Sequence, residues 1–214
     1  TIINPKIRIP SQIKSAKIIH MSKNKGHARC NAFGIKHLSA SSDFDYLILM
    51  DGDGEDRPEE IKLLVDKILH EPNKSVVAKR IKRSEGPLFQ MLYRLHKGLT
   101  FLTTGKLINF GNYSCLTKHD LKNLSIKASL WSSYSGSFKS NVKNYNEINS
   151  IRGIRYFGPT QMSLFKLVIH SFSIIAVFKY RAFFISLVLL ASFHYLGIFI
   201  KFNFLLFQIL IVLF

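Results

Sequence analysis

The chain of 214 residues has few acidic side chains, and they are unevenly distributed. Thirty Lys and Arg residues outnumber thirteen Asp and Glu residues, so the formal net charge is +17. Beyond Glu85, the only carboxylates are Asp120 and Glu147. A surplus of this size indicates a polyanionic partner, such as nucleic acid, anionic lipid headgroups or a phosphorylated substrate. A nucleic-acid surface would interleave aromatic side chains with the basic ones, whereas the aromatic residues here gather in the apolar tail.

Cysteine is also scarce, which argues against a disulfide framework. Cys30 and Cys115 are the only two, and neither has a CxxC or Cys/His neighbour at metal-binding spacing. A reduced, cytosol-facing domain is therefore expected. No signal peptide and no internal repeat is visible. The chain starts at Thr1 and stops inside an apolar run at Phe214, which predicts truncation at both ends.

The most informative segment is the apolar run Tyr46–Met50, which leads directly into acidic residues. A short apolar run bounded by glycines and acids predicts a strand buried on both faces, as in a parallel sheet. Asp51, Asp53 and Glu55 would then follow the carboxyl end of a central strand, where open α/β sheets bind ligands. Their oxygen atoms suit Mg²⁺ or Mn²⁺, a metal that commonly bridges to a diphosphate.

Two other interpretations of this segment remain open. A calcium-binding EF-hand loop matches the first acidic positions, but Asp56 replaces the required glycine and Lys62 replaces the final glutamate. The segment would also be explained by a solvated acidic turn that caps the helix expected from Pro58.

The remaining pattern predicts strands alternating with helices, and hence a mainly parallel α/β sheet flanked by helices. A strand at 16–20, a helix at 27–39 and the strand at 46–50 would form a parallel pair with a right-handed crossover. The other expected elements are a helix from Pro58 with an apolar stripe at Ile61, Leu64, Val65, Ile68 and Leu69, a strand at 75–78, a helix at 87–101 and a strand at 109–116. In residues 117–150, Trp131 and Phe138 are the expected core anchors.

The apolar tail predicts a membrane-anchoring segment. Ala182–Ile200 contains no Lys, Arg, Asp or Glu, and its nineteen residues would extend roughly 28 Å, enough to cross a bilayer core. Residues 202–214 would supply a truncated second helix of a transmembrane hairpin. Residues 164–178 are expected to lie in the headgroup plane. The alternative is that all these segments are core helices of a larger soluble domain.

These features divide the chain into a catalytic domain at 1–163 and a membrane part at 164–214. The excess of Lys and Arg before the first span places the catalytic part in the cytoplasm.

Several motifs occur in an order that resembles the family 2 inverting glycosyltransferases of the GT-A fold. The motifs are Asn24-x-Gly26, Asn31 and Gly34, Asp51-Gly52-Asp53, Pro58-Glu59, Val76 to Arg80, and the basic stretch from Arg155 to Ser163. The likeness is greatest to the branch of dolichyl-phosphate mannose synthase and bacterial polyprenyl-phosphate sugar transferases. It is good over residues 16–116 and looser to residue 163. The first strand of that family is expected before residue 16 and is not present.

For the donor, the resemblance implies that Asp51 and Asp53 hold a nucleotide-sugar together with Mg²⁺ or Mn²⁺. Glu55 stands where the mannose synthase motif has a third metal ligand. Asn24 and Gly26 match a turn beside the donor nucleotide. Asp53 is thus expected to be catalytic.

For the acceptor, the resemblance implies that Arg80, which is also expected to be catalytic, acts near a phosphate, and Arg83 or Lys82 would assist it. No general base with motif context follows Asp53, and a lipid phosphate needs none because it is already anionic. The alternatives are that these cations form a solvated basic edge, that the acceptor is a hydroxyl group in cell-surface polysaccharide, or that the protein is a non-enzymatic basic membrane anchor.

The overall expectation is an enzyme of the bacterial inner membrane that moves a single sugar from a nucleotide-sugar to a polyprenyl phosphate. Anionic lipid would be a further partner, and nucleic acid would not.

Overall fold

The structure is a computed structural model that describes residues 11–40, 44–82, 87–158 and 163–200. Its strands are β1 (Tyr46–Leu49), β2 (Val76–Lys82), β3 (Phe110–Thr117) and β4 (Asn146–Ile151). Its α-helices are α1 (His27–Ser39), α2 (Ile61–His70), α3 (Pro87–Thr104), α4 (Lys118–Ser125), α5 (Tyr134–Asn141), α6 (Leu164–Val177) and α7 (Lys179–Ile200). Two short 3₁₀ helices are η1 (Pro58–Glu60) and η2 (Ala128–Trp131).

The four strands form one sheet in the order β1-β3-β2-β4. β3 is antiparallel to both β1 and β2, whereas β4 is parallel to β2. The expectation of a mainly parallel sheet is therefore correct for the direction of β1, β2 and β4 and wrong for β3. The reason is that β3 begins beside the end of β2, with Phe110 opposite Lys79, and so runs back along it.

The strand expected at 16–20 is wrong, because this segment is exposed and has no regular structure. Ile18 and Ile19 are 49% and 42% exposed. A strand is stable only when a neighbour completes its hydrogen bonds, and in the described sheet β1 pairs with β3 alone. The predicted parallel pair between 16–20 and β1 is consequently not formed.

Helices cover both faces of the sheet, so the fold is a mixed α/β sandwich. On one face, α1, α4 and α5 contribute Ala32, Leu121, Leu124 and Phe138 to the larger apolar core. On the other face, Leu64 and Ile68 of α2 pack with Tyr113 and Cys115 of β3. The stripe predicted for the helix after Pro58 thus faces the sheet through Leu64 and Ile68, and Ile61 packs against the same core. Phe138 is a core anchor as expected, but Trp131 is not, because it is 39% exposed.

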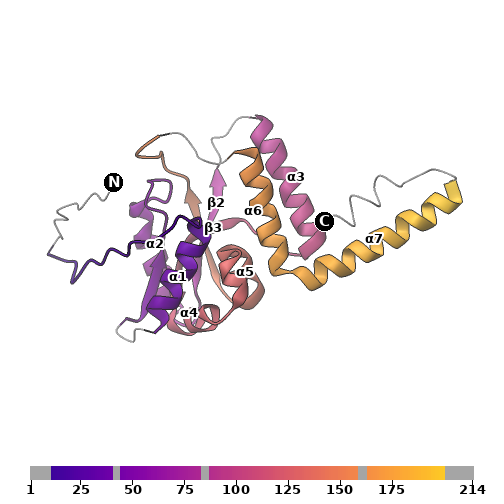
Figure 1. Cartoon of the computed structure of the whole chain (residues 1–214). Helices are drawn as coiled ribbons and strands as arrows, with labels where there is room; N and C mark the ends of the chain where they lie inside the picture. Colours follow the sequence, from indigo (N-terminus) through magenta and orange to yellow (C-terminus); the bar gives the residue numbers. More distant parts are fainter. Residues whose placement is uncertain (1–10, 41–43, 83–86, 159–162, 201–214) are drawn as a thin grey trace.

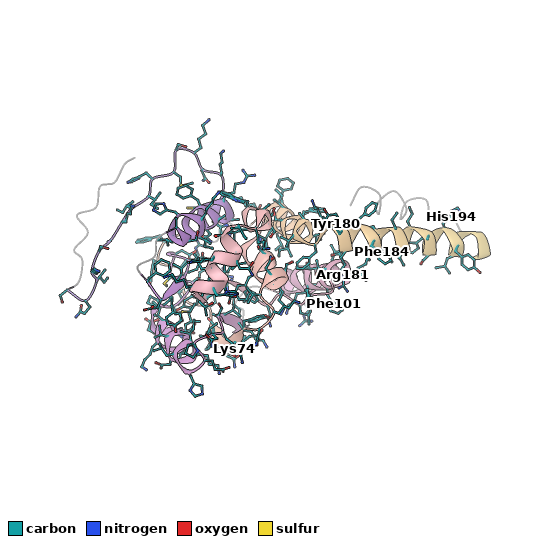
Figure 2. All side chains as sticks on the ribbon, turned by 90° about the horizontal axis from the view of Figure 1, so that it is seen from below. Lys74, Phe101, Tyr180, Arg181, Phe184 and His194 are labelled. Carbon is teal, nitrogen blue, oxygen red and sulfur yellow. The ribbon has the colours of Figure 1, made fainter. Side chains whose placement is uncertain are left out.

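Three long helices, α3, α6 and α7, lie on one side of the domain. In Figure 1, α6 and α3 lie side by side, and α7 extends away from the domain. Ile174 and Ile175 of α6 are buried, so α6 is packed onto the domain along one face. The guanidinium group of Arg181 in α7 lies against Gly105, just beyond the end of α3. Figure 2 shows Arg181 near Phe101 of α3, at the base of the protruding helix.

Among the described helices, none is by itself both long and apolar enough for a membrane span. Segments of α6 and α7 meet the requirement only as a pair, Phe165–Val177 with Lys179–Leu196, and the two are bent by 100°. The second helix of the predicted hairpin, at 202–214, lies outside the described residues.

Candidate functional site

The acidic turn, defined as residues 51–57, directly follows β1 and leads into η1. Asp53 folds the turn locally, because its Oδ1 accepts a hydrogen bond from the amide of Glu55 at 3.0 Å. Asp56 closes the turn on itself through Oδ2, which accepts a hydrogen bond from the Asp51 amide at 2.9 Å. The carboxylates are thus fixed at the end of the predicted strand. The expectation of a central strand buried on both faces is wrong, because β1 is at the edge of the described sheet and is half-buried.

β3 reaches the acidic turn through Asn112. The Nδ2 of Asn112 donates a hydrogen bond to Oδ1 of Asp51 at 3.0 Å. The antiparallel pairing of β3 with β1 brings these residues together across 61 positions of sequence. Reasoning from the sequence missed Asn112, because the contact depends on a strand pairing that no local pattern specifies.

Arg80 of β2 also lies at the acidic turn, where it contacts a buried carboxylate. Its Nη2 is 3.3 Å from Oδ1 of Asp56, which is only 3% exposed. Burial raises the pKa of Asp56 above its usual value, whereas the Asp51 amide and the Arg80 guanidinium act to lower it. Gly111 leaves room for this guanidinium group, because a Cβ at that position would lie 3.1 Å from Nη2. Arg83, the second predicted phosphate-binding residue, lies outside the described residues.

Residues 152–156, here called the strap, follow β4 and cross the acidic turn. Arg155 bridges two carboxylates, with Nη2 3.1 Å from Oδ2 of Asp53 and Nη1 3.4 Å from Oε1 of Glu55. Arg152 forms a close ion pair with Oε2 of Glu55. Each oxygen of Glu55 therefore forms an ion pair with a guanidinium group. These contacts join residues about a hundred positions apart, so sequence spacing gave no sign of them.

The backbone of the strap is bonded to the turn as well. The amide of Gly153 donates to the carbonyl of Glu55 at 2.9 Å, and the amide of Tyr156 donates to the carbonyl of Asp53 at 2.8 Å. Gly54 has φ +91°, and a Cβ on it would lie 2.8 Å from the carbonyl oxygen of Ile154. A Cβ on Gly153 would overlap the carbonyl oxygen of Gly54. The strap can approach this closely only because glycine is present on both sides.

The oxygen atoms of Asp51 and Asp53 suit a divalent cation, since Mg²⁺ is usually held by one or two carboxylates together with substrate phosphates. Glu55 differs in having both oxygens on guanidinium groups, whereas Asp53 has one oxygen on Arg155. Among the described residues, no group of three or more His, Cys, Asp and Glu side chains is arranged to hold a metal ion. The role of Asp51, Asp53 and Glu55 as metal ligands stays a prediction, and the two aspartates are the stronger candidates because Glu55 has both oxygens on guanidinium groups.

Asn24 and Gly26 lie in a separate hollow at the start of α1. The Oδ1 of Asn24 accepts a hydrogen bond from the Gly26 amide at 3.0 Å. The cavity has a volume of about 780 Å³ and is lined by residues 21–27, residues 29–31 and Trp131. The two predicted donor-binding residues thus lie together in a basic cavity, and no hydrogen bond or ion pair of the described residues joins them to the acidic turn.

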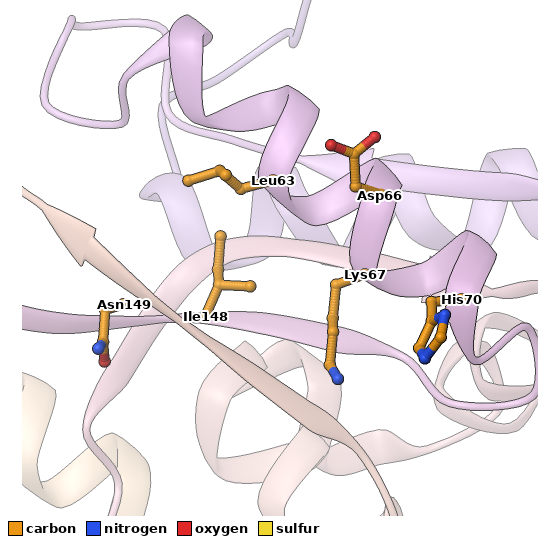
Figure 3. Close-up of a pocket in the computed structure, with 6 residues that line it drawn as sticks. All are labelled: Leu63, Asp66, Lys67, His70, Ile148 and Asn149. Atoms are coloured by element: carbon orange, nitrogen blue, oxygen red, sulfur yellow. The ribbon is translucent and has the colours of Figure 1, made fainter.

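A second cavity, of about 470 Å³, lies between α2 and the edge strand β4. Figure 3 shows its lining residues, Leu63, Asp66, Lys67, His70, Ile148 and Asn149. It contains none of the predicted site residues.

The two late carboxylates do not reach the acidic turn. Asp120 accepts a hydrogen bond from Ser75, at the end of the sheet where β1 and β2 begin. Glu147 forms an ion pair with Lys79 at 3.4 Å. Neither is placed to act as a base beside Asp53.

Comparison with protein families gives a match that covers most of the chain. Residues 6–158 match the model of the family described as glycosyl transferase family 2. No curated protein matches the chain.

Proposed function

Because the chain belongs to glycosyl transferase family 2, we propose that it transfers a single sugar from a nucleotide-sugar to a polyprenyl phosphate or a related envelope glycan, with inversion. One observation carries the choice of a phosphate acceptor. Three charged side chains, Arg80, Arg152 and Arg155, reach the acidic turn from other elements. They are cations, which suit an anionic nucleophile, whereas a sugar hydroxyl would need a carboxylate base.

Departure of the nucleoside diphosphate requires stabilisation of the negative charge that develops on it. Asp51 and Asp53 would hold the Mg²⁺ or Mn²⁺ that supplies Lewis-acid stabilisation there. Asn112 keeps Asp51 oriented through its hydrogen bond. The Asx-type bond from Asp53 to the Glu55 amide keeps the second carboxylate at the same end of β1.

Arg80 is the proposed contact for the acceptor phosphate. Its side chain is 20% exposed, and the bond through Nη2 to Asp56 fixes its direction. A guanidinium group held in this way can orient a phosphate by charge-assisted hydrogen bonds. In this arrangement Asp56 positions Arg80 and does not contact the substrate.

Membrane association is supported by the composition and placement of α3, α6 and α7, none of which contains an acidic residue. α3 exposes a stripe formed by Met91, Leu95, Leu99 and Leu102, and α6 exposes Phe165, Val168, Ile169 and Phe172. Stripes at helical spacing are typical of helices that lie in a membrane interface. With a bend of 100°, α7 would point along the membrane normal if α6 lay in the headgroup plane.

This orientation would place α3 and α6 against a bilayer that contains anionic lipid and the polyprenyl carrier. We propose the bacterial inner membrane, with the catalytic domain on the cytoplasmic side. The basic residues Lys166, Lys179 and Arg181, on α6 and at the start of α7, would contact lipid headgroups.

The proposal is tested with the full chain in membranes, supplied with Mn²⁺, a panel of radiolabelled nucleotide-sugars, and either polyprenyl phosphate or free sugar acceptors. Label is expected in the lipid extract. Arg80→Ala is expected to raise the KM for polyprenyl phosphate about tenfold or more and to change donor affinity by less than about twofold.

Lys62→Ala supplies a matched control, because Lys62 is a well-exposed cation on α2 that forms an ion pair with Asp66 of the same helix. Label that enters only water-soluble glycan, with no dependence on the lipid, would show that the acceptor is a hydroxyl group.

A further inference from the structure

Glu55 has a guanidinium group on each of its two oxygens, whereas Asp53 has one, that of Arg155, on a single oxygen. Glu55 is 9% exposed, and its two oxygens contact guanidinium groups from the strap. Oxygens that are already shared by two cations are poor ligands for a third, because the positive charges repel. Asp51, in contrast, has the neutral amide of Asn112 on one oxygen.

We propose that Glu55 is a positioning residue and not a metal ligand: it holds Arg152 and Arg155 on the acidic turn, so that Arg155 reaches Asp53 where the donor diphosphate binds. The inference rests on the proposed function for the identity of the ligand. The contacts that carry it are properties of the protein alone.

Arg155 gives the first argument that Glu55 is needed. The Nε of Arg155 is buried and has no hydrogen-bond partner among the described residues. A buried unpaired donor is costly, and a guanidinium group would recover that cost by turning toward water. Ion pairs with Glu55 and Asp53 oppose this movement. Without Glu55, Arg155 would keep only one carboxylate and would be expected to leave the turn.

The glycines give an independent argument that the strap is built to lie on the turn. Gly54 and Gly153 face one another so closely that a Cβ on either would collide with backbone of the other segment. The amides of Gly153 and Tyr156, which directly follow Arg152 and Arg155, donate hydrogen bonds to the carbonyls of Glu55 and Asp53. The ion pairs therefore follow from the backbone geometry and are not a chance contact of long side chains at the surface.

The test uses the full chain in detergent micelles and a double-mutant cycle of Glu55→Gln, Arg152→Met and the combination. Three quantities are measured: Mn²⁺ affinity by electron paramagnetic resonance, affinity for UDP and GDP by calorimetry, and the KM and kcat of sugar transfer. Thermal unfolding of the four proteins gives a fourth measurement that needs no ligand.

If Glu55 positions the arginines, each single variant weakens binding of the diphosphate about tenfold, and the double variant is no worse than either one. Donor KM rises by a similar factor, whereas kcat changes by less than about threefold. Mn²⁺ affinity in Glu55→Gln stays within about twofold of the wild type, because Asp51 and Asp53 are unchanged. The unfolding temperatures are non-additive in the cycle.

If Glu55 instead ligates the metal, Glu55→Gln weakens Mn²⁺ binding about tenfold or more, and Arg152→Met has no such effect. Additive effects of the two substitutions on diphosphate affinity and on unfolding temperature would also overturn the proposal.

Arg57→Met is the matched control, because Arg57 belongs to the same turn but pairs only loosely with Glu59 and Glu60, at 3.7 and 4.0 Å. It is expected to leave all four measurements nearly unchanged. A wild-type chain that binds neither UDP nor GDP would contradict the proposed donor. The Mn²⁺ measurement and the unfolding cycle would still decide the role of Glu55.

Discussion

The two ends of the sheet each contain a buried carboxylate, but they use it differently. At the end where β1 and β2 begin, Asp120 accepts a hydrogen bond from the hydroxyl of Ser75, which in turn accepts one from the Thr117 amide. At the end where β1 finishes, Asp56 pairs with the guanidinium group of Arg80. Both aspartates are less than a tenth exposed.

The two carboxylates differ in whether their hydrogen-bond partners are accessible to a ligand. Ser75 and Thr117 are buried, and Thr117 pairs with Tyr46 of β1. A ligand therefore cannot readily replace them as hydrogen-bond partners around Asp120. The guanidinium groups at the other end are partly exposed and carry charge that a phosphate could share. Burial alone therefore does not identify a functional carboxylate, whereas the chemistry of its partner does.

The largest expected effect is that of Asp53→Asn, which should lower sugar transfer about 100-fold or more. The substitution removes a charge that faces Arg155 and that is proposed to hold the metal. The remaining oxygen can still accept the hydrogen bond from the Glu55 amide, so the unfolding temperature should change little. Transfer of radiolabelled sugar and thermal unfolding are measured on the same preparation. Near-normal transfer would remove Asp53 from the site.

Gly153→Ala is expected to raise the donor KM about tenfold, because the new methyl group would push the strap away from Gly54 and carry Arg155 with it. The control is Gly34→Ala in α1, where an added Cβ meets nothing within 4 Å. Donor KM is measured for both variants. An unchanged KM in Gly153→Ala would show that the position of the strap is irrelevant to the donor.

Asp120→Ala tests the other end of the sheet, and its expected effect is on stability. The variant leaves the buried hydroxyl of Ser75 without its acceptor, which should cost about 2 kcal/mol of unfolding free energy. Nucleotide affinity should not change, because Asp120 lies at the end opposite the acidic turn. Chemical denaturation and calorimetry are the measurements. If the folded variant lost nucleotide binding, Asp120 would not be a purely structural carboxylate, and the contrast between the two ends of the sheet would be wrong.

Local patterns were enough to predict the elements whose signals are contained in a few residues. Pro58 with Glu59 and Glu60 predicted a helix start, and η1 runs into α2 there. The acidic turn was placed correctly at the end of β1, because an apolar run followed by Asp and Gly is a local signal.

The sequence could not reveal features that depend on distant pairing. The direction of β3 depends on its partners, and the same alternation of side chains suits either direction. The arginines of the strap meet Glu55 across about a hundred residues, so the sequence suggested a free metal ligand where the structure has an ion pair. Ile18 and Ile19 resembled a strand, but no neighbouring strand is described for them.

The smallest expected effect is on the pH dependence of stability, and it concerns the hydroxyl group of Tyr113. Its hydroxyl donates to the carbonyl of Arg57 at 2.7 Å, which ties the end of the acidic turn to β3. Burial, and then the negative charges of Glu60, Asp56 and Glu59, raises the pKa of Tyr113 to about 12 from the usual 10.0.

The folded protein thus keeps this proton where the unfolded chain loses it. The contribution of Tyr113 to stability is present below pH 10.0 and falls as the pH rises toward about 12. Unfolding free energy measured across this window should decrease with pH, and phenolate absorbance should show one tyrosine that ionises late. In Tyr113→Phe that part of the decrease should disappear. The same slope in the variant would mean that the turn is not anchored by this hydroxyl, and the acidic end of the sheet would then depend on its arginines alone.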